Sequence, residues 1–327
     1  MPTPPTPHFA PSEAVKKLGQ APRSPLFFRG LARCQLGASP VFSRPLRVQI
    51  QPSHLLDRGS PIYNDRWRIT YMRFRLLTYN IHKGIGGIDR RYRPERIVET
   101  VAHCQPDIVL LQEVDDGAPR SNHHRQVDWL GDALGLPHRA YQANVSLRQG
   151  GNYGNAILSR FPLHDVRDLD LTVPLKKRRQ ALVAHCRLSF DGHIRTMLVF
   201  NFHLGLAGYE RNIQLRRFLN SEALKYLHHN TPIVAAGDFN DVWGTLGRRL
   251  LLPVGFQSAA KRIKTFPAIL PIRPLDRIFF RGDLTLDHSF ASRTKTAQLA
   301  SDHLPMVADF VLTNGALRPE TPAEPGK

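Results

Sequence analysis

Short apolar runs alternate with amphipathic segments from Arg73 to Leu312. The runs are rich in Leu, Val, Ile and Phe and are bounded by polar or turn-forming residues, which is typical of buried strands. They predict strands at 75–79, 108–113, 155–158, 181–188, 196–202, 233–236, 277–280 and 306–312.

Helical periodicity fills three of the intervals between these runs. The segment 94–104 begins with Pro94, a favoured residue in a first helical turn, and stops before Pro106. Apolar residues recur near a 3.6-residue period over 210–229, ahead of Pro232. A shorter helix is predicted over 128–134, ending at Gly135.

The dipeptide Asp191-Gly192 joins two of the predicted strands, 181–188 and 196–202. This dipeptide favours a tight hairpin, so the pair is antiparallel and a purely parallel sheet is excluded. The expected fold class is α/β, with two mixed sheets face to face and helices outside, in the order helix, sheet, sheet, helix.

The two ends of the chain differ in composition from the part between them. Residues 1–71 hold 11 of the 26 prolines, with ten Lys and Arg against three Asp and Glu. We expect a disordered extension there, with an organelle-targeting segment or translation starting at Met72 as alternatives. Residues 72–313 are expected to form one domain, and 314–327 a disordered tail.

Location and partners are weakly constrained by composition. No apolar run is long enough to span a membrane, and three cysteines without C-x-x-C spacing predict a reducing, cytoplasmic setting. The formal charge of +18 favours a polyanion, either nucleic acid or an anionic membrane surface, although solubility alone could explain it. A monomer is expected.

Several predicted strands end on a polar side chain that is costly to bury alone. Asn80 and Glu113 end the first two strands, Asp238 and Asn240 follow 233–236, and His303 lies just before the last strand. Convergence of these groups on a metal ion and a phosphate would explain them.

Seven short motifs occur in an order that resembles the endonuclease/exonuclease/phosphatase superfamily, which has a deoxyribonuclease I-like fold. The start of the chain's catalytic region, 78–84, is most similar to small uncharacterised bacterial members. The motifs are Thr78-Tyr79-Asn80, Leu111-Gln112-Glu113-Val114, the segment 154–159, Asn201-Phe202-His203-Leu204, Gly237-Asp238-Phe239-Asn240, Leu275-Asp276-Arg277-Ile278 and Ser301-Asp302-His303.

The resemblance implies a four-layer α/β/β/α sandwich and a divalent metal, Mg²⁺ with Mn²⁺ as a substitute. Glu113 would be the main ligand, because Mg²⁺ prefers oxygen and takes one or two carboxylates while keeping water. Asn80 and Asp302 would assist it.

The resemblance also implies the remaining roles. Asp238 and Asn240 would position or deprotonate the attacking water, and Asp276 would orient His303, which would act as a general base or a phosphate clamp. His203 is shared with diesterases of the deoxyribonuclease and sphingomyelinase kinds. The candidates for holding phosphate are Asn155, Arg179 and Lys83.

Three functions fit this sequence. The first is a metal-dependent phosphodiesterase acting on nucleic acid, as an endonuclease or exonuclease, and the second is the same chemistry on a phospholipid or sphingolipid head group at an anionic membrane. The third is a basic binding module without catalysis, which the retention of every expected polar position disfavours.

Overall fold

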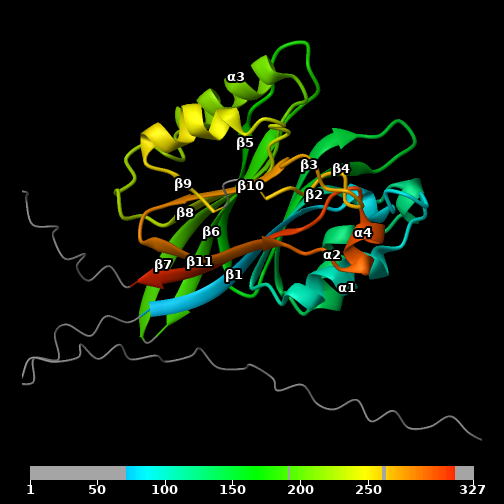
Figure 1. The fold of residues 1–327 in the computed structure, drawn as a ribbon, viewed down its shortest axis with the longest axis horizontal. Helices are drawn as coiled ribbons and strands as arrows, with labels where there is room; N and C mark the ends of the chain where they lie inside the picture. The colour runs from blue at the N-terminus through cyan, green and yellow to red at the C-terminus, as the bar shows by residue number, and fades with distance from the viewer. Residues whose placement is uncertain (1–70, 191, 260–262, 314–327) are drawn as a thin grey trace, which may run out of the picture. The chain divides into compact units, whose positions relative to one another are not determined.

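The chain forms two six-stranded sheets packed face to face, with helices on both outer faces (Figure 1). The computed structural model describes residues 71–190, 192–259 and 263–313. The first sheet has the order β11-β12-β1-β2-β4-β3, and the second has the order β5-β6-β7-β8-β10-β9. This is the predicted four-layer sandwich.

The first sheet contains β1 (Tyr71–Asn80), β2 (Ile108–Asp116), β3 (His138–Ser146), β4 (Asn152–Ser159), β11 (Leu284–Ala291) and β12 (Met306–Thr313). The second contains β5 (Leu163–Asp170), β6 (Gln180–Phe190), β7 (His193–His203), β8 (Ile233–Asp238), β9 (Gln257–Ser258) and β10 (Asp276–Arg281). The α-helices are α1 (Pro94–Cys104), α2 (Gln126–Leu134), α3 (Gly208–Leu219) and α4 (Lys295–Ala300). Short helical turns lie at His82–Gly84, Pro119–Ser121, Gly247–Leu251 and Leu252–Val254.

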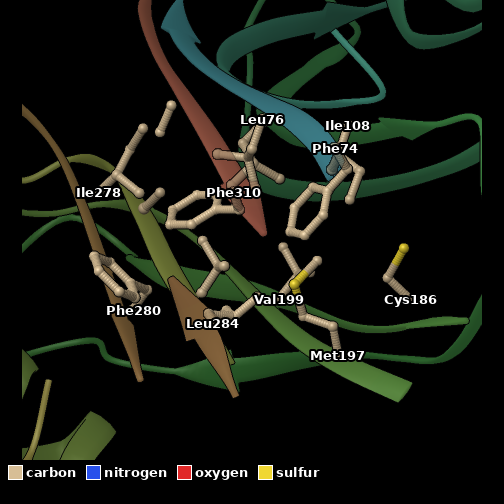
Figure 2. Close-up of a cluster of buried hydrophobic side chains, with 14 of the residues drawn as sticks. Phe74, Leu76, Ile108, Cys186, Met197, Val199, Ile278, Phe280, Leu284 and Phe310 are labelled. Atoms are coloured by element: carbon tan, nitrogen blue, oxygen red, sulfur yellow. The ribbon is translucent and has the colours of Figure 1, made fainter. Parts of the chain in front are cut away.

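The central core lies between the two sheets, and Figure 2 shows side chains from both sheets meeting there. Phe74 of β1 stacks on Phe310 of β12, and Phe310 makes an edge contact with Phe280 of β10, with ring centroids 5.1 Å apart. Alternate residues of β1 face opposite ways, so Leu76 joins this core while Leu77 joins the layer under the helices. Strands buried on both faces read as continuous apolar runs, which is why the sequence identified them.

Helices close each outer face. On the first sheet, α1 and α2 bury Ile97 and Val127 in a cluster that also contains Leu111. On the second sheet, Phe218 of α3 makes edge contacts with Phe200 and Phe202 of β7, at centroid distances of 4.9 and 5.0 Å. Figure 1 shows α3 over one sheet and α1, α2 and α4 over the other.

The sheet topology brings the functional strand ends to one edge. β1 runs parallel to β2, and β7 runs parallel to β8, so each pair delivers its carboxyl ends together. β10 runs antiparallel to β8 and begins where β8 ends, so Asp276 pairs with Asp238. Ligand sites gather at such carboxyl ends in α/β proteins.

Every strand predicted from an apolar run is present, but others were missed. β5 and β11 are edge strands with mostly exposed or half-buried side chains, and β3 alternates rather than running apolar. The helix predicted over 210–229 was too long, because α3 ends at Leu219. There Ser221 Oγ donates to the Phe218 carbonyl in a turn, while Leu224 and Leu227 still pack on the core.

The predicted extension and tail lie outside the described residues, except Tyr71, which begins β1 and pairs with Thr313. Cys104 and Cys186 are buried free thiols, while Cys34 is not among the described residues. None of the helices within 71–313, gaps aside, is long and apolar enough to cross a membrane.

Gly237 allows β8 to approach β7 at the base of the site. Its φ is +142°, and a Cβ there would lie 2.1 Å from the Phe202 carbonyl oxygen. The Gly237→Ala variant is therefore expected to lose about 2–3 kcal/mol of unfolding free energy in urea titrations. Gly208→Ala is the control, since a Cβ at Gly208 would meet only Arg211 at 3.8 Å. Equal stability of the two variants would contradict this account.

Candidate active site

The polar strand ends of both sheets meet around Asp238, which is 2% exposed at the end of β8. Asn80 of the first sheet donates from Nδ2 to Asp238 Oδ2 at 3.1 Å. Nε2 of His203 and Nε2 of His303 lie 3.8 and 3.9 Å from the same oxygen. One carboxylate oxygen therefore faces an amide and two imidazoles that come from distant parts of the chain.

Asn80 is held in a fixed orientation at the end of β1. Its Oδ1 accepts from the His82 amide at 3.1 Å, which leaves Nδ2 for Asp238. Its carbonyl accepts from Ser301 Oγ at 2.7 Å, which ties β1 to the segment before β12. The side-chain oxygen at the end of this strand thus closes a turn with His82.

Glu113 owes its position to a β-bulge in β2. The register with β4 shifts between Gln112 and Val114, and Glu113 lies between them with a φ of +56°. Bulges often redirect side chains beside active sites, and this left-handed conformation is uncommon for Glu. The bulge directs the Glu113 carboxylate to Lys83 Nζ, with which it forms an ion pair, and places Oε1 3.9 Å from His203 Nε2.

The pKa values of Glu113 and His203 are both lowered by their surroundings. Burial raises the pKa of Glu113, but the positive charges of His203 and Lys83 outweigh it and lower that pKa to about 2. Burial and the Arg179 charge lower the pKa of His203 to about 4, so the imidazole is neutral at neutral pH. At neutral pH the attraction that keeps Glu113 ionised therefore comes from Lys83.

Asp276 and His303 form a buried pair. His303 Nδ1 lies 2.8 Å from Asp276 Oδ2, and Thr265 Oγ1 donates to the same oxygen. Burial lowers the pKa of His303, but the negative charge and hydrogen bond of Asp276 and the charge of Asp238 raise it to about 10. A charged imidazole with Nε2 directed towards Asp238 suits a phosphate clamp better than a general base.

Asp238 itself is in a mixed environment. Burial raises its pKa, and the positive charge of His303 opposes this effect. Its Oδ1 accepts from the Asn240 amide at 2.9 Å, while Asn240 Nδ2 donates to the Leu204 carbonyl at 3.0 Å. Both residues predicted to handle water are therefore present at the centre, and Asn240 is fixed by the loop after β7.

Asp302 lies beside this cluster, and within the described residues its side chain hydrogen-bonds to its neighbour Ser301. Its Oδ1 accepts from Ser301 Oγ at 3.4 Å, and its carbonyl accepts from the Ala268 amide at 2.7 Å. Its negative charge contributes to the raised pKa of His303. The metal-ligand role of Asp302 stays a prediction.

Arg179 is the most informative of the predicted phosphate-binding residues. It is 7% exposed, and among the described residues its guanidinium has neither a hydrogen bond nor an ion pair. A buried cation without a partner is costly, so an anionic oxygen beside Arg179 would be stabilised. Beside it lies a pocket of about 440 Å³, lined by Ala143, Asn144, Val145, Ser146, Lys177 and Arg178.

Asn155 links the two sheets in this arrangement. Its Nδ2 donates to Gln142 Oε1 and to the Gln180 carbonyl, each at 3.2 Å, while its Oδ1 is buried without a partner. Both amide hydrogens are thus used within the protein, and phosphate binding by Asn155 stays a prediction.

Sequence patterns gave no signal for several supporting residues. Two of them, Thr265 and Phe266, lie in a loop without periodicity. Thr265 donates a hydrogen bond to Asp276, and the ring centroid of Phe266 is 4.9 Å from that of His303. Below the site, Gln112 Nε2 donates to Asn201 Oδ1 at 2.7 Å and joins β2 to β7. Gln112 and Asn201 both belong to the seven motifs, but the sequence did not predict the hydrogen bond between them.

The donor set fits a divalent cation that keeps much of its water. In the described ranges, no three His, Cys, Asp or Glu side chains are arranged to hold a metal by themselves. Glu113 is nevertheless an ionised, partly exposed carboxylate that already attracts an ammonium group, and Asn80 offers an amide oxygen nearby. Mg²⁺ commonly binds through one or two such oxygens.

The fold and this set of residues define a known class of enzymes. The model of the Endonuclease/Exonuclease/phosphatase family matches residues 77–303, and the chain belongs to this family. Members of the family are typically hydrolases and commonly depend on divalent metals, and phosphodiesterases are among them. The resemblance inferred from the seven motifs is confirmed.

The chain is also similar to particular proteins. "Uncharacterized protein YbhP" of Escherichia coli K12 is 30% identical over 254 residues, covering 73% of this chain and 96% of YbhP. An endonuclease/exonuclease/phosphatase from Beutenbergia cavernae has a similar structure, with a TM-score of 0.62 at 22% identity, covering 75% of this chain and 72% of that one. Truncated TDP2 of Caenorhabditis elegans has a TM-score of 0.54 at 19% identity, covering 73% and 97%. These structures share the fold.

Proposed function

We propose that this protein hydrolyses phosphodiester bonds by in-line attack of a water molecule, with Mg²⁺, or Mn²⁺ in its place, as the cofactor. The observation that carries the proposal is the convergence on Asp238 of Asn80, His203 and His303 from both sheets. Asp238 is buried, and burial raises its pKa, which suits a group that orients water and accepts its proton.

Each side chain has one task in the proposed reaction. The water oxygen bonds to phosphorus, the bond to the leaving alkoxide breaks, and the alkoxide takes a proton from solvent, to which the general base later returns the proton of the attacking water. Asp238 takes the proton of the water, and Asn240 keeps that carboxylate in place through its backbone amide. His303, charged through Asp276, neutralises a phosphoryl oxygen.

The bound cation would be held by Glu113, with Asn80 and Asp302 in support, and would supply further neutralisation of charge on the phosphoryl group. Lys83 keeps the Glu113 carboxylate ionised when no cation is bound. His203 remains neutral next to Glu113, so it can accept or donate a hydrogen bond to the phosphoryl group or its water.

A soluble diester tests this proposal without any assumption about the natural substrate. Full-length protein is expected to hydrolyse bis(p-nitrophenyl) phosphate with Mg²⁺ or Mn²⁺ and to lose that activity in excess EDTA. The monoester p-nitrophenyl phosphate should be a poorer substrate. Absence of metal-dependent diester hydrolysis would instead support the non-catalytic binding module.

Arg179 is proposed to hold a phosphate oxygen bidentately. Arg179→Met is expected to raise KM for the diester by about 10- to 100-fold, since a charged hydrogen bond contributes about 1.5–3 kcal/mol. Its folding stability should stay equal or rise, because the variant removes an unpartnered buried charge. A stability loss with an unchanged KM would show that Arg179 is structural.

Two substrate classes suit this centre. Nucleic acid matches the charge of +18 and the basic residues beside Arg179, and the protein would then be an endonuclease or exonuclease. A lipid head group is the second class, and exposed apolar side chains around the catalytic edge favour it.

A further inference from the structure

Unusually exposed apolar side chains lie at the edge of the sheets where β1, β2, β7 and β8 end and β10 begins, which we call the catalytic edge. Fifteen large apolar or aromatic residues in the described ranges are exposed, and five of these are more than two-thirds exposed. Four of the five, Leu175, Leu206, Trp243 and Leu270, lie in loops at this edge, and Tyr226 is the exception. Apolar groups this exposed are ordinary one at a time, but a group of them marks an interaction surface.

Each of these loops adjoins a strand end that carries a residue of the site. Leu175 precedes Arg179 and β6, Leu206 follows His203, Trp243 follows Asn240, and Leu270 precedes Asp276. Ile269 and Ile272 flank Leu270, and Ile88 lies in the loop after β1. We call this set the apolar rim: Ile88, Leu175, Leu206, Trp243, Ile269, Leu270 and Ile272.

Hydrogen bonds hold the loops of the rim in place. The loop that carries Leu270 is a small hairpin closed by the Arg273 amide, which donates to the Phe266 carbonyl at 2.8 Å. The loop that carries Trp243 is closed by Asp241, whose Oδ2 accepts from the Leu246 amide at 2.9 Å. The apolar side chains are therefore presented on ordered turns.

The charge around the rim is positive. Leu175 is followed by Lys176, Lys177 and Arg178, all exposed, and Ile272 is followed by exposed Arg273. Lys176 Nζ lies 5.5 Å from the centre of the Tyr209 ring, which places this basic loop beside the start of α3. Of the acids in the rim loops, Asp89 is paired with Arg96, and Asp241 is buried.

This combination separates two kinds of phosphodiester substrate. Single-stranded nucleic acid is held by basic grooves and by aromatic side chains on which bases stack. Six of the seven rim residues are aliphatic and offer no stacking surface, and the exposed aromatic side chains beside the site are Trp243 and Tyr209. An anionic bilayer matches both features, since aliphatic side chains insert at the acyl boundary and each Lys or Arg near the surface adds attraction to the lipid charge.

We propose that the apolar rim docks this protein on an anionic membrane surface and thereby presents the phosphodiester of a lipid head group to the catalytic centre. Docking stands on the exposed residues alone, and hydrolysis of the lipid rests on the proposed phosphodiesterase activity. The rim loops adjoin the strand ends that carry the site, so a docked protein would bring the head groups to this edge of the sheets.

Vesicle flotation with full-length protein tests the docking. Binding is expected to vesicles of phosphatidylcholine with phosphatidylglycerol and to be at least about tenfold weaker for phosphatidylcholine alone. The double variant Leu206→Ser/Leu270→Ser should weaken binding to the anionic vesicles by about tenfold or more, as should Lys176→Gln/Lys177→Gln. Trp243 fluorescence should shift to the blue on binding, and Trp243→Phe should lose that change.

Two controls separate docking from folding and from catalysis. Tyr226→Ser removes a side chain that is 98% exposed away from the rim and should leave vesicle binding unchanged. Hydrolysis of bis(p-nitrophenyl) phosphate should be unaffected by the rim variants, whereas release of phosphorylated head groups from vesicles should fall with binding. If the wild-type protein binds vesicles but does not hydrolyse bis(p-nitrophenyl) phosphate, the proposed function is wrong while the docking proposal stands.

The proposal is overturned if wild-type protein does not float with anionic vesicles, or if the rim variants float equally well. It is also overturned if the wild type does not bind vesicles but binds and cleaves single-stranded DNA or RNA. In that case Trp243→Ser should reduce binding to the nucleic acid. That outcome would assign the edge to nucleic acid.

Discussion

Glu113→Gln is expected to reduce kcat for diester hydrolysis by at least about 10²-fold. The substitution preserves size but removes the negative charge that attracts Lys83 and, in the proposed enzyme, the cation. Losing a residue that merely orients a metal ligand typically costs 10- to 100-fold in affinity or activity, so losing the main carboxylate should cost more. The Mg²⁺ concentration for half-maximal rate should rise in the same variant.

Glu222→Gln is the matched control, because its side chain is 77% exposed and pairs with the neighbouring Lys225. It should retain the wild-type rate and metal dependence. Isothermal titration with Mg²⁺ gives a readout independent of turnover, in which Glu113→Gln should bind more weakly. A variant with normal kcat and normal Mg²⁺ affinity would remove Glu113 from the metal site.

His303→Ala should lower kcat/KM by about 10²–10⁴-fold, the range for a positioned proton-transfer or charge-stabilising group. His103→Ala changes an exposed histidine on α1 and should be silent. The partner variant Asp276→Asn keeps the shape of the pair but removes the charge that raises the pKa of His303 to about 10. It should reduce the rate by less than His303→Ala does.

The pH profile distinguishes a clamp from a base. If charged His303 holds phosphate, kcat/KM should fall as pH rises through about 10, and Asp276→Asn should move that fall to lower pH. The same pair contributes to stability: the raised pKa of His303 means that its contribution is complete below about pH 6.5 and is lost as pH rises through about 10. If kcat/KM of Asp276→Asn falls at the same high pH as that of the wild type, a group other than His303 titrates there.

The sequence alone predicted most of the candidate site because the relevant signal is local. A polar residue next to a buried apolar run identifies a strand end, and this was sufficient for Asn80, Glu113, Asp238 and His303. The resemblance in the order of the motifs then added His203 and Asp276. The two-sheet fold followed from one hairpin dipeptide together with strands that read apolar on both faces.

What escaped prediction depends on contacts between distant segments or on backbone conformations without a sequence signal. Nothing in the run 108–116 marks the bulge that directs Glu113 to Lys83. Thr265 is supplied by an irregular loop, and no pattern connects it to Asp276. The edge strand β5 has too few buried residues to produce an apolar run.

The hydrogen bond from Asn80 to Asp238 crosses the boundary between the two sheets. The geometry of the site therefore depends on the position of one sheet relative to the other. A substitution deep in the interior, for instance at Phe310, can disable the chemistry by letting the halves slide, even though every polar group of the centre is intact.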